Sequence, residues 1–305
     1  MKVWVLKAVI QKGISFLPFK HRVNYLFQKY VTKGVLLTDA LFIDKLTHCR
    51  SHLTAFKNYH PQSPHCTSLE IGTGWYPIVP IGLYLAGGDK IYTIDISGLL
   101  TTGAIHNTIN FYLNYNESGK LKEYLSADPA RLEKLKSLLQ KNDSPQQLLR
   151  ELNIEAIVGD ARHISLPDAY FDLINSNNTF EHIYPEILGD ILKEFKRLLK
   201  SDGIMSHQID LSDHFAHLDK SITIYNFLRF DDAEWGRIDN SIQPQNRMRI
   251  NEYRQLYEQT GHKIVYENNV SADKEGLKSV LLDKRFAGMS AEDVAVSHSL
   301  LVSKV

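Results

Sequence analysis

The chain of 305 residues is long enough for one large α/β domain or two small ones, each with a substantial buried core. Its 35 basic and 35 acidic side chains balance, so the overall charge gives no reason to expect a nucleic-acid partner, and we predict none. No apolar stretch approaches the roughly 20 residues needed to span a bilayer. Cys49 and Cys66 have no metal-ligand spacing and are typical of a reducing compartment, so we predict a cytoplasmic protein. The sequence leaves the oligomeric state open.

Basic residues are concentrated near the start of the chain, where seven lysines and arginines precede the first acidic residue, Asp39. Apolar residues recur at helical spacing over residues 3–17, which predicts an amphipathic helix. Such a helix can make peripheral contact with the inner, anionic face of a membrane, or it can pack on the core and keep its lysines in water. Further helices are predicted around 23–31 and over 39–57, so residues 1–60 are expected to form a helical extension.

Residues 61–305 are predicted to form an α/β domain. A strand over 67–71 leads through a glycine-containing turn into an apolar helix over 78–86 and then into a second strand over 90–96. A strand–turn–helix–strand unit of this kind builds a parallel sheet. The segment 101–153 is too long for a simple crossover, so we expect a helical insertion there.

The rest of the chain continues the alternation of strands and helices that such a sheet requires. The segment 211–250, which is rich in aromatic and histidine residues, is expected to shape a substrate pocket. The predicted strands are at 154–158, 171–176, 203–209, 263–268 and 299–304, and the predicted helices are at 186–199 and 251–260.

The turn after the first strand contains Gly72 and Gly74, which let the backbone turn sharply and leave room for a ligand to approach. The helix that follows presents free backbone N–H groups to that ligand. A dinucleotide site requires a third glycine, but that position is Pro77, whose ring and missing N–H suit a pyrophosphate poorly. Glu70 places negative charge beside the turn, which favours a cationic ligand. A turn that binds no ligand is the alternative.

Carboxylates also follow the next two strands. Asp95 ends the second strand, where a carboxylate can accept hydrogen bonds from both hydroxyls of a ribose. Asp160 and Ala161 follow the third strand, where a carboxylate can accept the exocyclic amine of an adenine. Solvated aspartates at strand ends are common. Three such features at successive strands nevertheless meet at the edge where open α/β sheets bind ligands, so we predict a ligand site there.

The order of these motifs resembles that of class I, Rossmann-like S-adenosylmethionine-dependent methyltransferases over residues 68–209. The resemblance rests on Glu70–Gly74, Asp95, Gly159–Ala161, Phe171–Ile174 and Glu181–Ile183. It implies a sheet of about seven strands, the last of them antiparallel, with helices on both faces. It also implies S-adenosyl-L-methionine as the cofactor. The family's pattern places the cofactor against Glu70, Gly72, Thr73, Gly74, Asp95, Ile96, Asp160, Ala161 and Asn177.

The later part of the chain is similar to methyltransferases of bacterial glycan and surface-polymer biosynthesis, on residues 210–215, 226–228 and 246–249. This resemblance implies O-methylation of a sugar, a glycan or another small-metabolite hydroxyl. N-methylation of a small molecule or peptide is one alternative. An inactive methyltransferase-like binding subunit is another, although a decayed site need not have kept all of its acidic residues.

An oxygen acceptor usually needs a general base. We predict that His182, Asn177 and Asp210 are catalytic, with His182 as the base because its usual pKa lies near 6.5. His182 could instead merely pack the start of a helix. The oxygen and imidazole groups in this region could also hold a metal ion. We predict none, because the metal-dependent methyltransferases that this segment resembles carry a glutamate where this chain has Asn178.

Two arginines are candidates for binding the acceptor. Arg247 and Arg249 are spaced to share one side of an extended segment, and a pair of guanidiniums can clamp a phosphate or carboxylate. We therefore predict that they bind an anionic group of a small-molecule or glycan acceptor, together with His214. Ion pairs at the protein surface are the alternative for both arginines.

Overall fold

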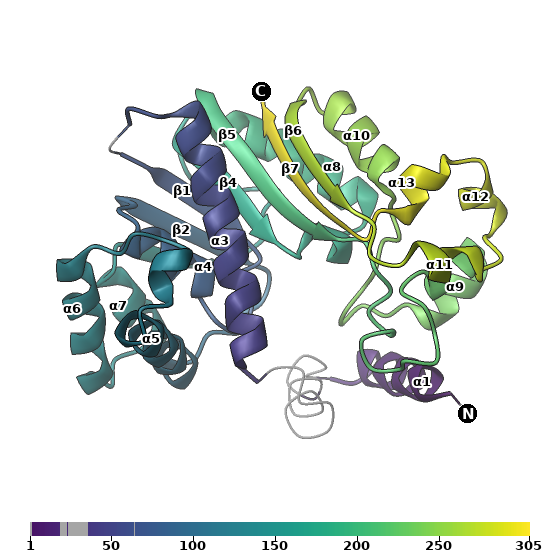
Figure 1. Cartoon of the computed structure of the whole chain (residues 1–305), viewed down its shortest axis with the longest axis horizontal. Coiled ribbons are helices and arrows are strands. Elements are labelled where there is room, and N and C mark those ends of the chain that lie inside the picture. The colour runs from purple at the N-terminus through teal and green to yellow at the C-terminus, as the bar shows by residue number, and fades with distance from the viewer. Residues whose placement is uncertain (1, 19–22, 24–35, 64) are drawn as a thin grey trace.

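A seven-stranded sheet in the order β3-β2-β1-β4-β5-β7-β6 forms the centre of the protein (Figure 1). The computed structural model describes residues 2–18, 23, 36–63 and 65–305. β1 to β5 run parallel, and β7 is antiparallel to both of its neighbours. The predicted Rossmann-like methyltransferase sheet is thus confirmed. The strands are β1 Thr67–Ile71, β2 Lys90–Asp95, β3 Ile154–Val158, β4 Phe171–Asn177, β5 Leu199–Asp210, β6 Lys263–Val270 and β7 His298–Lys304.

Helices cover both faces of this sheet, as predicted. In Figure 1, α3 lies across one face, and α8 and α10 lie behind the other. The α-helices described are α1 Val3–Ser15, α3 Asp39–Tyr59, α4 Ile78–Leu85, α5 Thr102–Glu117, α6 Pro129–Ser137, α7 Pro145–Arg150, α8 Pro185–Leu198, α9 Asp232–Ile238, α10 Ile250–Gln259, α11 Lys274–Lys278, α12 Lys284–Ala287 and α13 Ala291–Ala295.

The strands supply side chains to two cores because successive residues of a strand point to opposite faces. On β4, Leu173 belongs to the core beneath α3 and α4, whereas Ile174 belongs to the core beneath α8 and α10. On β7, Leu300 and Leu301 divide in the same way. A sheet that is covered on both faces needs strands of this continuously apolar kind.

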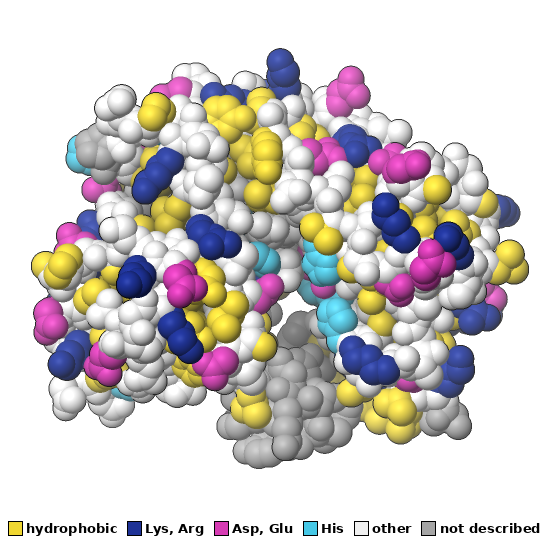
Figure 2. Space-filling view, in the orientation of Figure 1, with side chains coloured by type: hydrophobic (Ala, Val, Ile, Leu, Met, Phe, Trp, Pro, Cys, Tyr) yellow, Lys and Arg dark blue, Asp and Glu magenta, His cyan; other side chains and the backbone are white. Residues whose placement is uncertain are grey.

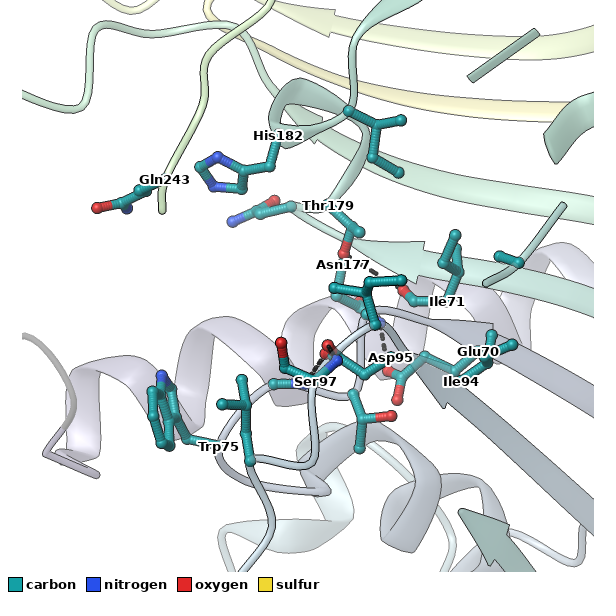
Figure 3. Close-up of a pocket in the computed structure, with 18 of the residues that line it drawn as sticks. Glu70, Ile71, Trp75, Ile94, Asp95, Ser97, Asn177, Thr179, His182 and Gln243 are labelled. Carbon is teal, nitrogen blue, oxygen red and sulfur yellow. Dashed lines mark hydrogen bonds between the residues drawn. The ribbon is translucent and has the colours of Figure 1, made fainter. Parts of the chain in front are cut away.

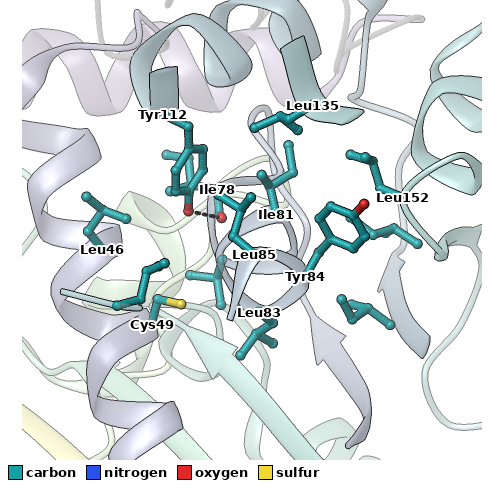
Figure 4. Close-up of a cluster of buried hydrophobic side chains, with 14 of the residues drawn as sticks. Leu46, Cys49, Ile78, Ile81, Leu83, Tyr84, Leu85, Tyr112, Leu135 and Leu152 are labelled. Carbon is teal, nitrogen blue, oxygen red and sulfur yellow. Dashed lines mark hydrogen bonds between the residues drawn. The ribbon is translucent and has the colours of Figure 1, made fainter. Parts of the chain in front are cut away.

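The segment 101–153 is a helical insertion, as predicted, and it completes the core beneath α3. Figure 4 shows Leu46 and Cys49 of α3 facing the side chains of α4, with Leu135 of α6 closing the far side. Tyr112 of α5 is fully buried, and its hydroxyl donates a hydrogen bond of 2.7 Å to the carbonyl of Ile78. The insertion is therefore part of the domain and not an appendage.

α3 also belongs to this core, although the sequence places it in an extension that ends at residue 60. Its His52 is completely buried, and the ring nitrogens lie 2.8 Å from the hydroxyl of Ser206 in β5 and 3.0 Å from the amide oxygen of Asn177 in β4. The predicted boundary between residues 60 and 61 does not separate two cores, because α3 packs directly on the sheet.

α1 is a helix over the predicted segment, but its exposed side is not a basic face. Lys12 is turned inward, and its ammonium donates to the carbonyls of Gly236 at 2.9 Å and Asp239 at 2.6 Å. The outward face is apolar, with exposed side chains at Val3, Leu6, Val9, Phe16 and Leu17.

Contact of α1 with an anionic membrane surface remains a prediction. None of the helices in the described part of the chain combines the length and the apolar character that a membrane-spanning helix needs. A further helix is predicted around residues 23–31, and residues 24–31 of it lie outside the described part of the chain.

The segment after β5 packs with α1 into a third apolar cluster. Trp4 of α1 contacts Phe215 with ring centroids 5.9 Å apart, and Phe215 in turn packs on Trp235 of α9. Phe286 of α12 joins the same cluster. The sequence predicted neither α9 nor the three short helices between β6 and β7. These helices cover the end of the sheet beside β7 (Figure 1).

Candidate functional site

A cleft of about 770 Å³ opens at the carboxyl ends of the central parallel strands, where open α/β sheets bind ligands. Figure 2 shows the molecule hollowed between its two halves, with histidine side chains at the edge of the hollow. Figure 3 shows Asp95, Ser97 and Trp75 on one side of the cleft and His182 and Gln243 on the opposite side. The cleft therefore has two walls that come from different parts of the sheet edge.

The glycine turn forms the first wall. Gly72 and Gly74 have positive φ angles of 84° and 64°, which side chains other than hydrogen adopt only with strain. The Gly74 N–H donates to Oδ2 of Asp95 at 3.0 Å, and the Ser97 N–H donates to Oδ1 at 2.9 Å. These bonds hold Asp95 at the cleft, as the sequence predicts. Thr73 is buried beneath the turn, where its hydroxyl pairs with that of Thr93.

Gly72→Ala is expected to destabilise the protein. A Cβ atom at this position would lie 2.2 Å from Oγ1 of Thr179, and the positive φ adds strain, so the turn must move. We expect a loss of about 2 kcal/mol or more in the free energy of unfolding, measured by chemical denaturation.

Gly103→Ala in α5 is the matched control. A Cβ atom there meets no atom within 4 Å, so this change is expected to leave stability unchanged or to raise it by up to about 1 kcal/mol. Equal stability of the two variants would contradict the role given to the turn.

Glu70 lies at the base of the cleft and begins a buried chain of hydrogen bonds. Its carboxyl oxygens accept bonds from the Asn177 amide at 2.8 Å and from the Thr93 hydroxyl at 3.2 Å. The Asn177 oxygen faces Nε2 of His52 at 3.0 Å, and Nδ1 of His52 faces the hydroxyl of Ser206. This network assigns the proton of His52 to Nε2. Burial lowers the pKa of His52 to about 4 and raises that of Glu70 to about 8.

The raised pKa of Glu70 makes its contribution to stability depend on pH. The folded protein holds the proton up to about pH 8, whereas the unfolded chain releases it near 4.5. The stabilisation is therefore fully present below about pH 4.5 and is lost as the pH rises through 8.

Glu70→Gln keeps the side-chain shape and removes the ionisation. We expect the difference in unfolding free energy between the glutamine variant and the parent to grow in the variant's favour from about pH 5 to pH 8. Denaturant titrations at several pH values measure it, and a difference that does not change with pH would show that Glu70 is ionised in the folded protein.

Asp160 and Ala161 line the cleft at the end of β3, as predicted, together with the exposed side chain of Ile96. The Asp160 carboxylate is already engaged, because Nη2 of Arg162 donates to it at 2.6 Å. The hydrogen bonds from Arg162 lower the pKa of Asp160 to about 2. A carboxylate has lone pairs for about four hydrogen bonds. The Asp160 carboxylate can therefore still accept a hydrogen bond from an amine. Its role in binding adenine remains a prediction.

His182 lies on the opposite wall, in a short 3-10 turn after β4. Its Nδ1–H donates to the carbonyl of Pro244 at 2.7 Å, so the lone pair of the neutral ring is on Nε2. Burial lowers the pKa of His182 to about 4. His214 and Asp210 lie beside it, with His182 and His214 ring centroids 4.9 Å apart and Nε2 of His214 at 3.4 Å from Asp210. The structure thus brings these three predicted residues together.

Arg247 and Arg249 do not form the predicted anion clamp. Arg249 is fully buried, and its guanidinium donates to the carbonyls of Leu211, Val294 and Val296. Arg247 is also buried and donates to two carbonyls near α9 and to Asp232. The prediction assumed an extended segment, but Arg247 has a φ of 57°, which turns the two side chains to different parts of the protein. Both arginines stabilise the fold.

Arg249→Met is expected to lower the free energy of unfolding by about 3–5 kcal/mol, because three buried carbonyls lose a charged donor. Arg237→Met is the matched control, since Arg237 is exposed, and we expect it to change stability by no more than about 0.5 kcal/mol. Thermal and denaturant unfolding measure both. Native stability of the Arg249 variant would contradict this assignment.

Several residues that line the cleft are absent from the set that the sequence predicts, and only some of them offered a signal in the sequence. Lys45 comes from α3, and a single lysine in a predicted helix gives no signal of a site. Gln243 comes from the loop before α10, and nothing local distinguishes it. Trp75 and Tyr76 did offer a signal, since two aromatic residues directly after a ligand-binding glycine turn are well placed to cover a bound molecule.

Residues 113–206 match a family model described as a methyltransferase domain. This segment of the chain is similar to a methyltransferase domain, and the matched residues run from α5 to β5. The glycine turn and Asp95 lie before them, so the placement of these residues at the cleft comes from the structure alone. Among curated protein sequences, none matches this chain.

Solved methyltransferase structures are similar to this chain at low sequence identity. An S-adenosylmethionine-dependent methyltransferase from Methanosarcina mazei has 15% identity and a TM-score of 0.43, covering 81% of this chain and 94% of its own. One from Leishmania major has 12% identity and a TM-score of 0.48, covering 99% and 83%. Phosphoethanolamine N-methyltransferase 2 from Haemonchus contortus, in complex with S-adenosyl-L-methionine, has 14% identity and a TM-score of 0.45, covering 83% and 52%.

Proposed function

We propose that this methyltransferase domain binds S-adenosyl-L-methionine in the cleft and transfers its methyl group to a small acceptor. One observation carries the proposal: the glycine turn, Asp95 and Asp160 follow three adjacent strands and line a single cleft. The turn keeps side chains away from the ligand, and the two aspartates offer acceptors for hydroxyl and amine groups. Glu70 at the base supplies a carboxyl group that ionises more readily once a cationic ligand is bound.

We further propose that the acceptor is a hydroxyl group of a sugar, a glycan or another small metabolite. The wall opposite Asp95 supports this choice, because His182 presents an unprotonated nitrogen there and Gln243 an amide. Both groups can bind a hydroxyl, and they leave space for an acceptor between themselves and the cofactor wall (Figure 3).

Methyl transfer to such an acceptor is an in-line displacement. The bond from sulfur to the methyl carbon breaks as the bond from the acceptor oxygen forms, sulfur loses its positive charge, and the hydroxyl proton leaves for solvent. Alignment of the two reactants supplies much of the acceleration. A general base is most effective when its pKa lies near the working pH. Burial lowers the pKa of His182 to about 4, so the ring is a weaker base than an ordinary histidine. We therefore give it the role of orienting the hydroxyl.

Asp95→Ala is expected to weaken the binding of S-adenosylhomocysteine by about 2–4 kcal/mol, because a charged acceptor for two hydroxyl groups is lost. Isothermal titration calorimetry measures the affinity directly. Asp202→Ala is the control, since Asp202 is exposed at the opposite end of β5 and should leave binding unchanged. If the parent protein binds no S-adenosylhomocysteine, the proposed function is wrong. If the Asp95 variant binds as tightly as the parent, the ribose assignment is wrong.

A further inference from the structure

The carboxyl group of Glu181 is buried beside the cleft without a hydrogen-bond partner. The residue is only 4% exposed, and neither Oε1 nor Oε2 is paired. The backbone N–H groups of Glu181 and Asp210 face the carboxyl group without reaching hydrogen-bond geometry. Buried polar atoms are nearly always satisfied in folded proteins, and an unpaired one destabilises the fold. A ligand that engages both oxygens would remove this cost.

Two imidazole rings face the same point. Ligand atoms of Glu181, His182 and His214 all lie within 4.8 Å of one another. Nε2 of His214 is buried, and its contact with Oδ2 of Asp210 at 3.4 Å does not reach hydrogen-bond geometry. The His182 ring is held in orientation by its Nδ1–H bond to Pro244, which leaves Nε2 as the atom that can ligate. Imidazoles that bind metal ions are commonly oriented by such a bond from the other nitrogen to a carbonyl.

A second carboxyl group lies beside this cluster. Oδ2 of Asp210 lies 3.4 Å from Nε2 of His214, and Asp210 is only 5% exposed. Two buried carboxyl groups and two imidazole rings converge there, and this set of donors suits a doubly charged cation. We propose that Glu181, His182 and His214, with Asp210 beside them, bind a divalent first-row transition-metal ion.

The donor set favours this class of ion. Two imidazoles and a carboxylate suit Mn²⁺, Fe²⁺, Co²⁺ or Zn²⁺, whereas Mg²⁺ and Ca²⁺ prefer oxygen ligands alone. Ligand atoms that share one ion at about 2.1 Å lie no more than about 4.2 Å apart, so small side-chain movements would close the site. A glutamate at position 178 is not needed for this site. Asp210 at the end of β5 and His214 after it supply the remaining groups.

The site has a use in the proposed methyl transfer, and this part of the inference rests on the proposed function. His182 lines the cleft on the acceptor wall, so the ion would be reachable by an acceptor hydroxyl. A bound cation of this kind acidifies a hydroxyl group that it contacts. With Nε2 of His182 bound to the ion, the ion would contact the acceptor hydroxyl in place of the ring. It would also supply the activation that the weakly basic His182 ring does not.

The test is Mn²⁺ binding to the full chain after treatment with a chelator. Isothermal titration calorimetry, together with loss of the electron paramagnetic resonance signal of free Mn²⁺, should give one ion per chain. Glu181→Gln removes the carboxylate at nearly constant shape and is expected to weaken Mn²⁺ binding about 100-fold or more, and His214→Ala should do the same.

His65→Ala is the matched control. His65 is exposed and forms a surface pair with Asp89 at 2.9 Å, the kind of pair that binds metal ions adventitiously, so its loss should leave the Mn²⁺ affinity unchanged. The site is refuted if the parent binds no Mn²⁺, or if only the His65 variant binds it more weakly. The binding of S-adenosylhomocysteine to the Glu181→Gln variant is a separate readout. If the Glu181→Gln variant still binds S-adenosylhomocysteine but no longer binds Mn²⁺, the result supports the site. If the parent protein binds no S-adenosylhomocysteine, the proposed function is wrong, whereas the Mn²⁺ result still stands.

Discussion

The buried chain of hydrogen bonds from Thr93 through Glu70, Asn177 and His52 to Ser206 joins β2, β1, β4, α3 and β5. Each of these groups would be costly to bury alone, and each is paired by the next. The network therefore requires the strands to keep one register and α3 to lie at one depth on the sheet. Glu70 and Asn177 of this network line the base of the cleft, so the same bonds that hold the elements together also fix the floor of the proposed ligand site.

This network contains no permanent charge pair, and that separates it from the other wall of the cleft. Burial raises the pKa of Glu70 and lowers that of His52, so both are neutral. On the other wall, the Glu181 carboxyl group has no hydrogen-bond partner, and Asp210 lies 3.4 Å from Nε2 of His214. One side of the cleft is complete as an uncharged hydrogen-bonded structure, and the other is incomplete. The unpaired carboxyl group on the incomplete side is the feature on which the proposed metal site rests.

Much of the fold could be predicted from the sequence because the signals are local. A buried strand is a short apolar run, and Gly72 and Gly74 mark the turn that follows it, so β1, β2 and Asp95 could be assigned together. The short helices between β6 and β7 could not, since they have only four or five residues and depend on packing against residues such as Phe227 and Trp235. The packing of α3 on the sheet could not be predicted for a related reason, because its contacts are with strands far along the chain.

The residues of the candidate site could likewise be predicted only in part. Asp95 and Asp160 could be predicted because a strand end fixes where its carboxylate lies. Arg247 and Arg249 could not, since two arginines in sequence reveal nothing of a backbone turned by a positive φ or of the carbonyls around them. The cluster of Glu181, His182 and His214 depends on β4 and β5 ending side by side, with the chain after β5 folding back over the edge. Only the tertiary structure joins these groups.

The place of β7 within the sheet has a consequence for the order in which the protein is built. β7 is antiparallel and lies between β5 and β6, so β6 has no strand to pair with until β7 has been made. During synthesis, β1 to β5 can assemble while one edge of β5 is still open. An open edge is a template for pairing with other chains. β7 closes that edge when it pairs with β5 on one side and with β6 on the other.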